Sequence, residues 1–187
     1  KLMKSQTTIN QKVYSICITL SGIVDSTKGV LTSSTLLDWY DVNLRKTFED
    51  KFDLSVIMEN DSNAFALYQK DFEYGRDVHN FVSITIGEGI GSGIILNGQL
   101  YNGSHGGAGE LGHQILYPEG KKCYCGQSGC LELYASEGFV IENINKGLGT
   151  SYDYQDIFVD HVVKKEIVYA NVFSAYKNIG YGIINLI

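Results

Sequence analysis

The chain has 187 residues, 44% of them hydrophobic and 19% charged, which is enough for one large domain or two small lobes with a core. Its net charge of −6 and its lack of a basic cluster exclude a DNA-binding module built from these residues alone. No run of about 18 apolar residues occurs, so we expect no membrane span, and the first residues lack the apolar core of a secretory signal.

Strand and helix patterns alternate along the first part of the chain. The β-branched run at residues 13–20 predicts a buried strand in which Cys17 is an inert core thiol, and residues 21–25 predict a turn. Asp41 is a candidate N-cap for a helix that runs to about residue 50. The other elements expected here are strands at residues 29–33 and 54–58, the polar residues 59–63, and a helix at residues 64–70.

The second part begins with the polar residues 71–80, which we expect to link two lobes. Asn97-Gly98 predicts a type I′ turn in a hairpin. The strands expected here are at residues 81–86, 94–96 and 99–101. The first expected helix starts at residues 131–135, and a second follows residues 136–138 and runs to about residue 146. A third helix, at residues 170–187, is expected to be largely buried. This alternation predicts an α/β protein. Its two lobes, residues 1–78 and 79–187, should enclose a cleft.

Residues 106–132, the His/Cys segment, carry a complete set of ligands for a metal ion. His113, Cys123, Cys125 and Cys130 form the pattern H-x9-C-x-C-x4-C. Zn²⁺ takes such ligands tetrahedrally, and four protein ligands make a closed, structural site with no position for a catalytic water. We therefore expect a structural zinc; the alternative is a chance cluster of buried thiols. Cysteines used as metal ligands also favour the cytoplasm.

Three polar residues, Glu59-Asn60-Asp61, follow the strand expected at residues 54–58. Ligands of α/β folds bind where strands end in this way. Asp61 is a candidate general base, and the Asn60 amide both donates and accepts hydrogen bonds, which suits a polyol. The alternative is that Asp61 only caps the next helix.

Residues 87–93 have a glycine at every second position. Such loops can present backbone N–H groups to a phosphate. This loop leads to a hairpin rather than a helix, so it is neither a dinucleotide fingerprint nor a P-loop, and Glu88 within it would repel phosphate. The alternative is a tight turn between two strands.

Glu110 and Glu132 flank the expected metal ligands. They are either ordinary surface carboxylates or groups whose positions the metal fixes.

Two stretches resemble the signature of the ROK family of repressors, open reading frames and kinases. They are Gly-Glu-Leu-Gly-His at residues 109–113 and Cys-Tyr-Cys-Gly-Gln-Ser-Gly-Cys-Leu-Glu at residues 123–132. Three further segments line up in the family's order, at residues 21–25, 59–64 and 87–93. The resemblance thus covers nearly the whole chain and implies an actin-like ATPase/sugar-kinase (ribonuclease H-like) fold, with a sugar in the cleft between two lobes.

The resemblance also implies roles for individual residues, carried over by position. The residues implied to contact the sugar are Asn60, Asp61, Glu110, His113 and Glu132. The implied zinc ligands are His113, Cys123, Cys125 and Cys130. Asp61 matches the catalytic base of the family's kinases.

The chain departs from the family's kinases in both of their phosphate loops. It has no match to the first loop, Asp-x-Gly-x-Thr, and Glu88 replaces the Thr of the second loop, Gly-Thr-Gly. A carboxylate at that position should repel phosphate. We therefore favour the sugar-sensing domain of a ROK transcriptional repressor. The alternatives are an ATP- and Mg²⁺-dependent sugar kinase with Asp61 as its base, and a sugar-binding homologue with neither role.

The first residue is not Met and the last residues are apolar, which predicts a chain cut from a longer protein at both ends. In a repressor of this family, DNA would be bound by a helix-turn-helix that precedes these residues. The family further implies a homodimer in the cytoplasm.

Overall fold

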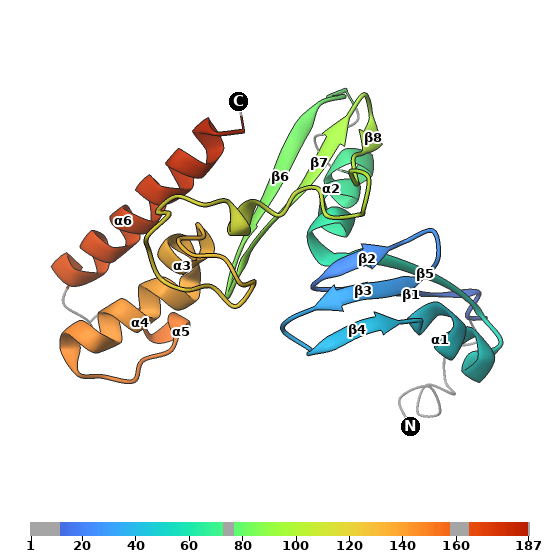
Figure 1. Cartoon of the computed structure of the whole chain (residues 1–187), viewed down its shortest axis with the longest axis horizontal. Helices are drawn as coiled ribbons and strands as arrows, with labels where there is room; N and C mark the ends of the chain where they lie inside the picture. The colour runs from blue at the N-terminus through green and yellow to red at the C-terminus, as the bar shows by residue number, and fades with distance from the viewer. Residues whose placement is uncertain (1–11, 73–76, 158–164, 187) are drawn as a thin grey trace. The chain divides into compact units, whose positions relative to one another are not determined.

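The computed structural model describes residues 12–72, 77–157 and 165–186 and shows a mixed α/β chain (Figure 1). The chain divides into two compact units, Lys1–Asp61 (unit 1) and Ser62–Ile187 (unit 2). The lobe boundary expected after residue 78 falls inside unit 2, and a functional division at that point stays a prediction. Among the described residues, none of the helices is both long and apolar enough to cross a membrane.

Unit 1 has two small sheets, one parallel and one antiparallel. Its elements are β1 (Ser15–Leu20), β2 (Ile23–Asp25), β3 (Val30–Ser34), β4 (Trp39–Val42), α1 (Leu44–Phe52) and β5 (Ser55–Asn60). β1 pairs in parallel with β5, and β2, β3 and β4 pair antiparallel in that order. Side chains from both sheets and from α1 form the core, which contains Val24, Leu31, Leu44, Val56 and Met58.

The region before α1 differs from the prediction. Asn43, and not Asp41, caps the helix, because its side-chain oxygen accepts the Lys46 N–H at 2.9 Å. Asp41 lies in β4 with a φ of 52°. Residues 23–25, expected in a turn, form β2. β2 and β4 are short and are held by pairing with β3. Their own residues therefore give only a weak strand signal in the sequence.

β1 is not the buried strand that its apolar run predicts. Its side chains alternate, so that Ile16 and Ile18 pack against the core while Cys17 is exposed. Successive side chains of a strand point to opposite sides, and in the described residues only one side of β1 is covered. Cys17 is therefore an exposed thiol rather than the core thiol expected.

Unit 2 combines a hairpin sheet with a set of helices. Its elements are α2 (Asp61–Phe72), which begins at the last residue of unit 1, β6 (Phe81–Ile86), β7 (Ile90–Leu96), β8 (Gln99–Leu100), the 3-10 helix η1 (Leu111–His113), α3 (Glu132–Ala135), α4 (Glu137–Leu148), α5 (Tyr154–Ile157) and α6 (Lys165–Ile184). The strands pair antiparallel in the order β6-β7-β8. Asn97 and Gly98 have φ values of 52° and 73°, as the predicted type I′ turn requires.

Helix α6 is predicted to be largely buried, but its described residues are buried on one face only. That face contacts α3 and α4, and it includes Ala175 and Ile179 (Figure 1). The opposite face exposes Tyr169, Phe173 and Tyr176. A helix that is apolar all round predicts burial on every side, yet the described residues supply packing partners for one side.

Glycines in β7 let α2 pack closely against the sheet. Gly91 and Gly93 belong to this strand, which begins at Ile90, earlier than predicted. A Cβ atom on Gly91 would collide with Ser62 Oγ, and a Cβ atom on Gly93 would collide with the Ala66 side chain. This part of the glycine pattern therefore serves helix–strand packing.

Substitution of Gly93 tests this packing. Gly93→Ala should lower the free energy of unfolding by about 1–3 kcal/mol, because the added methyl group pushes α2 away from β7. Gly147→Ala is a matched control, since Gly147 lies in α4 with open space around its Cβ position; alanine there should be neutral or stabilising by up to about 1 kcal/mol. Urea unfolding followed by circular dichroism measures both. Equal stability of Gly93→Ala and the unsubstituted chain would contradict the packing role.

Candidate functional site

The predicted ligand set comes together at one point in the His/Cys segment. The His113 nitrogen and the three thiol sulfurs all lie within 4.8 Å of one another. His113 Nδ1 is 3.7 Å from Cys123 Sγ, and Cys125 Sγ is 3.6 Å from Cys130 Sγ. Tetrahedral ligands placed 2.0–2.3 Å from one Zn²⁺ ion would be about 3.5–3.8 Å apart. All the described cysteines are free thiols, so the donor set fits zinc and is not consumed by a disulfide.

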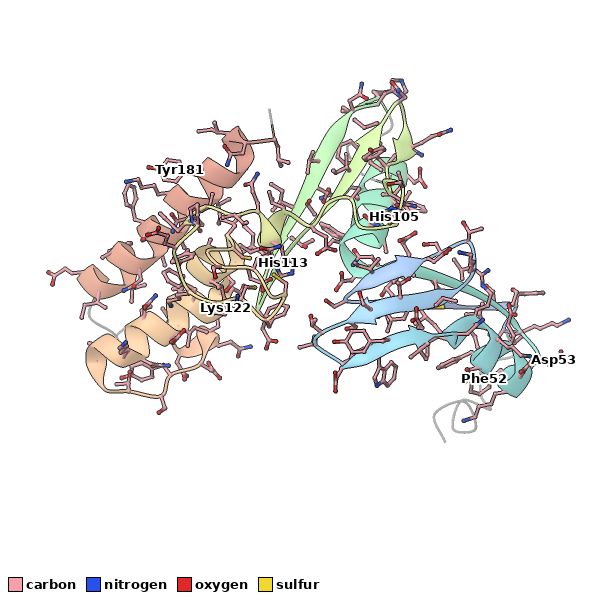
Figure 2. All side chains as sticks on the ribbon, in the orientation of Figure 1. Phe52, Asp53, His105, His113, Lys122 and Tyr181 are labelled. Atoms are coloured by element: carbon pink, nitrogen blue, oxygen red, sulfur yellow. The ribbon has the colours of Figure 1, made fainter. Side chains whose placement is uncertain are left out.

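Backbone turns with glycines at fixed places bring these ligands together. The Cys123 N–H donates to Gln127 O at 2.9 Å, and the Gly126 N–H donates back to Cys123 O at 3.1 Å. Gly126 and Gly129 have φ values of 94° and 77°, which other residues rarely adopt. Figure 2 shows His113 and Lys122 on this segment. The sequence therefore encodes a tight turn that places three sulfurs around the imidazole.

The thiols differ in acidity. Burial raises the pKa of Cys130 to about 12, and burial also raises the pKa of Cys123. For Cys125, burial is outweighed by the backbone hydrogen bond from Gln127 and by the neighbouring thiols, and its pKa is lowered. A metal ion must therefore displace at least the Cys130 proton at neutral pH, which links metal affinity to pH.

His113 lies between the thiols and a carboxylate. Its Nδ1 atom faces Cys123, while its Nε2 atom lies 3.9 Å from Glu110 Oε2. Glu110 directly precedes η1, the short helix that ends at His113, and its side chain is 44% exposed. The imidazole thus has one edge toward the metal site and the other toward an accessible acidic group.

Glu132 is buried, so the surface alternative is wrong for this residue. It is 7% exposed, and its Oε2 atom accepts the Ile90 N–H at 2.9 Å. A Cβ atom on Gly89 would lie 2.6 Å from the same oxygen, so a glycine is needed where the carboxylate approaches the β6–β7 turn. Glu132 lies two residues after Cys130 and therefore connects the candidate metal site to the hairpin.

The β6–β7 turn is the tight turn that one of the two alternatives predicted. The Gly87 N–H donates to Gly89 O, and Gly87 O accepts the Glu137 N–H at the start of α4, both at 2.9 Å. Glu88 is exposed at the tip of this turn. A carboxylate at this tip would oppose the approach of a phosphate.

The other predicted site residues lie in unit 1, at the carboxyl end of β5. Asn60 Nδ2 donates to Gly22 O at 3.0 Å, which fixes the amide. Glu59 accepts from Ser26 Oγ at 2.8 Å and from the Asn60 backbone N–H at 2.9 Å. Asp61 is exposed and is the first residue of α2. Asn60 and Asp61 are adjacent at this strand end, and Glu110, His113 and Glu132 belong to unit 2.

One aromatic residue near the site was not identified from the sequence. Tyr124 lies between Cys123 and Cys125, two of the candidate metal ligands, and its ring meets the His113 ring edge-on with centroids 5.3 Å apart. The signal that could have found it is its position between two of the candidate metal ligands.

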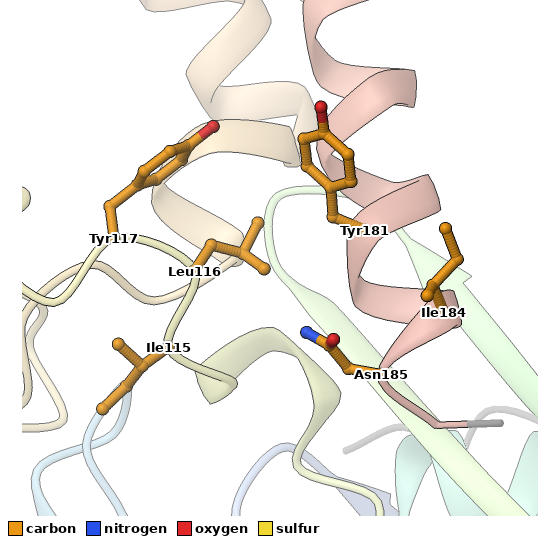
Figure 3. A pocket seen from close by; sticks show the side chains of 6 residues that line it. All are labelled: Ile115, Leu116, Tyr117, Tyr181, Ile184 and Asn185. Carbon is orange, nitrogen blue, oxygen red and sulfur yellow. The ribbon is translucent and has the colours of Figure 1, made fainter.

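A separate pocket of about 300 Å³ lies in unit 2 between the His/Cys segment and α6 (Figure 3). In Figure 3, Leu116 points from the segment toward α6. The residues that line it are Ile115, Leu116, Tyr117, Tyr181, Ile184 and Asn185. None of the predicted site residues is among them, so this pocket is not part of the predicted site.

Comparison with known proteins identifies relatives of two kinds. The family model described as ROK family matches residues 1–187. The chain is 34% identical over 142 residues to the xylose repressor of Bacillus subtilis, covering 76% of this chain and 36% of the repressor. It is 37% identical over 127 residues to the glucokinase of Thermotoga maritima, covering 67% of this chain and 40% of the glucokinase. The chain thus spans well under half the length of these two relatives.

Solved structures of both kinds share the fold. A ROK family glucokinase from Streptomyces griseus, in complex with glucose and AMPPNP, aligns with a TM-score of 0.83 at 27% identity over 95% of this chain and 62% of that chain. A ROK family transcriptional regulator, a homologue of the E. coli MLC protein, aligns with a TM-score of 0.76 at 29% identity over 94% of this chain and 47% of that chain. The predicted α/β fold of the actin-like sugar-kinase class is confirmed.

The acidity of the thiols predicts a pH-dependent metal site. Zinc affinity should fall as the pH is lowered from about 8 to about 6, because protons compete with the metal for Cys130 and Cys123. Competition with a chromophoric chelator measures this affinity. Cys17→Ser, which changes an exposed thiol outside the cluster, should leave it unchanged, whereas Cys125→Ser should weaken it strongly. Equal zinc affinity at both pH values would contradict the proton competition.

Proposed function

The chain belongs to the ROK family, and on this premise we propose that it is the sugar-sensing part of a transcriptional repressor. The observation that carries the proposal is Glu88 at the exposed tip of the β6–β7 turn. In the kinases of the family this turn carries Thr and faces phosphate, whereas a carboxylate repels it. The likeness to the xylose repressor of Bacillus subtilis over 76% of this chain supports the same conclusion.

The sugar contacts that we propose are Asn60, Asp61, Glu110, His113 and Glu132. Amide, carboxylate and imidazole groups together offer the donors and acceptors that sugar hydroxyls require. Asn60 is held by the Gly22 carbonyl, and Glu132 by the Ile90 N–H. Side chains fixed in this way lose little conformational entropy on binding, which favours affinity and selectivity.

We further propose that His113, Cys123, Cys125 and Cys130 hold a structural zinc ion. The four donors lie within 4.8 Å of one another, and four protein ligands close the coordination sphere. The ion would stabilise the turns of the His/Cys segment without taking part in a reaction. His113 would then be oriented by the metal through one nitrogen and present the other nitrogen to the side of Glu110.

In this proposal the sugar acts as an effector and not as a substrate. Its binding must favour one of two states of the repressor, since a ligand with equal affinity for both states shifts nothing. These residues carry a net charge of −6, so a part of the protein outside them would bind DNA. The repressor would act as a homodimer in the cytoplasm.

A sugar kinase is the second candidate, favoured by the 37% identity to the glucokinase of Thermotoga maritima. Asp61 would then deprotonate the sugar hydroxyl that attacks the γ-phosphate of ATP, with Mg²⁺ bound to the nucleotide. Both candidates use the same sugar contacts, so sugar binding alone does not separate them.

Two measurements separate the candidates. The protein should show a raised melting temperature with one or more of D-xylose, D-glucose and N-acetyl-D-mannosamine, because a ligand that binds only the folded state stabilises it. With the same sugar, ATP and Mg²⁺, a coupled assay for ADP should show no turnover. Steady ADP release that depends on the sugar would overturn the repressor proposal and support the kinase.

Asp61→Asn tests the role of this carboxylate in sugar binding. We expect the sugar Kd to rise by roughly tenfold or more, since a hydrogen bond to a charged group contributes about 1.5–3 kcal/mol. The melting temperature without sugar should stay unchanged. Asp50→Asn is the matched control, because Asp50 is an exposed helical carboxylate whose ion pair with Lys46 contributes little. An unchanged Kd in Asp61→Asn would assign Asp61 to the helix start alone.

A further inference from the structure

Tyr124 has an unusual position for a large aromatic side chain. It lies between the proposed zinc ligands Cys123 and Cys125, on a turn closed by backbone hydrogen bonds. Its side chain is nevertheless exposed, with 59% of the residue accessible to solvent. An aromatic ring that is held at a fixed place and left uncovered is available for contact with a ligand.

The neighbours of Tyr124 are the proposed sugar contacts of unit 2. Its ring meets the His113 ring at an interplanar angle of 85° with centroids 5.3 Å apart. Burial raises the pKa of Tyr124, and the nearby carboxylates of Glu132 and Glu110 raise it further.

The ring contributes little to the turn itself. The turn is held by the Cys123 N–H to Gln127 O and the Gly126 N–H to Cys123 O, which are backbone contacts. The phenol is likewise not among the four metal donors. Removal of the ring should therefore leave the metal site intact, which separates a ligand-binding role from a structural one.

We propose that Tyr124 is a sugar-contacting residue that forms an aromatic wall beside Glu110, His113 and Glu132. A pyranose or furanose has an apolar C–H face and a rim of hydroxyl groups. The exposed ring would pack against the C–H face, while the carboxylates and the imidazole bind hydroxyls. This inference rests on the proposed sugar-binding function and adds a residue to its site.

Three variants of the protein test the proposal: Tyr124→Ala, Tyr124→Phe and the control Tyr169→Ala. Tyr169 is an exposed tyrosine on α6, 70% accessible, outside the His/Cys segment. Isothermal titration with D-xylose and with D-glucose gives the sugar Kd, and metal analysis gives the zinc content. Tyr124→Ala should raise the Kd by roughly tenfold or more, about 1.4 kcal/mol of binding free energy. Tyr124→Phe should raise it less, because it keeps the ring.

The control and the metal readout decide between the roles. Zinc content and melting temperature without sugar should match the unsubstituted protein in all three variants, and Tyr169→Ala should bind sugar normally. A normal Kd in Tyr124→Ala overturns the inference and leaves the proposed function intact. Loss of zinc in Tyr124→Ala also overturns it, since the ring would then serve the metal site. Absence of binding of either sugar by the unsubstituted protein overturns the inference together with its premise.

Discussion

The convergence of one imidazole and three thiols at one point is the constraint that the turns of the His/Cys segment satisfy. The His/Cys segment has short elements and many turns, and it contributes Leu111 and Leu131 to a core shared with β7, α3 and α6. Buried Cys123 and Cys130 fix its far end, and the His113 ring fixes its near end. A metal ion held by these four groups would add its binding free energy to the stability of the segment.

Two hydrogen bonds join the chain that follows this cluster to the β6–β7 hairpin. Glu132, just after Cys130, holds the Ile90 N–H, and the Glu137 N–H at the start of α4 holds the Gly87 carbonyl. The β6–β7 turn is therefore fixed at both of its ends by the chain that follows the cluster. Glu88 at its tip is the one feature of this arrangement that bears directly on whether a phosphate can approach.

Local signals predicted much of this arrangement. The His/Cys cluster, the strand β6 and the hairpin turn at Asn97 were identified from spacing and turn chemistry, because each depends on residues close in the sequence. The start of α1 was misplaced because two polar residues, Asp41 and Asn43, are both suitable caps. Pairing with β3 placed the first of them in a strand and left the second to cap the helix.

The sequence by itself determined which groups can bind a metal and in what order they follow one another, since four ligands so close along the chain have few ways to be arranged. The tertiary structure alone decided burial. Glu132 is buried because the glycine turn of the hairpin closes over it, and Cys17 is exposed because only one side of β1 is covered in the described residues. Burial depends on which distant segments pack against a residue, and a linear pattern does not encode that partner.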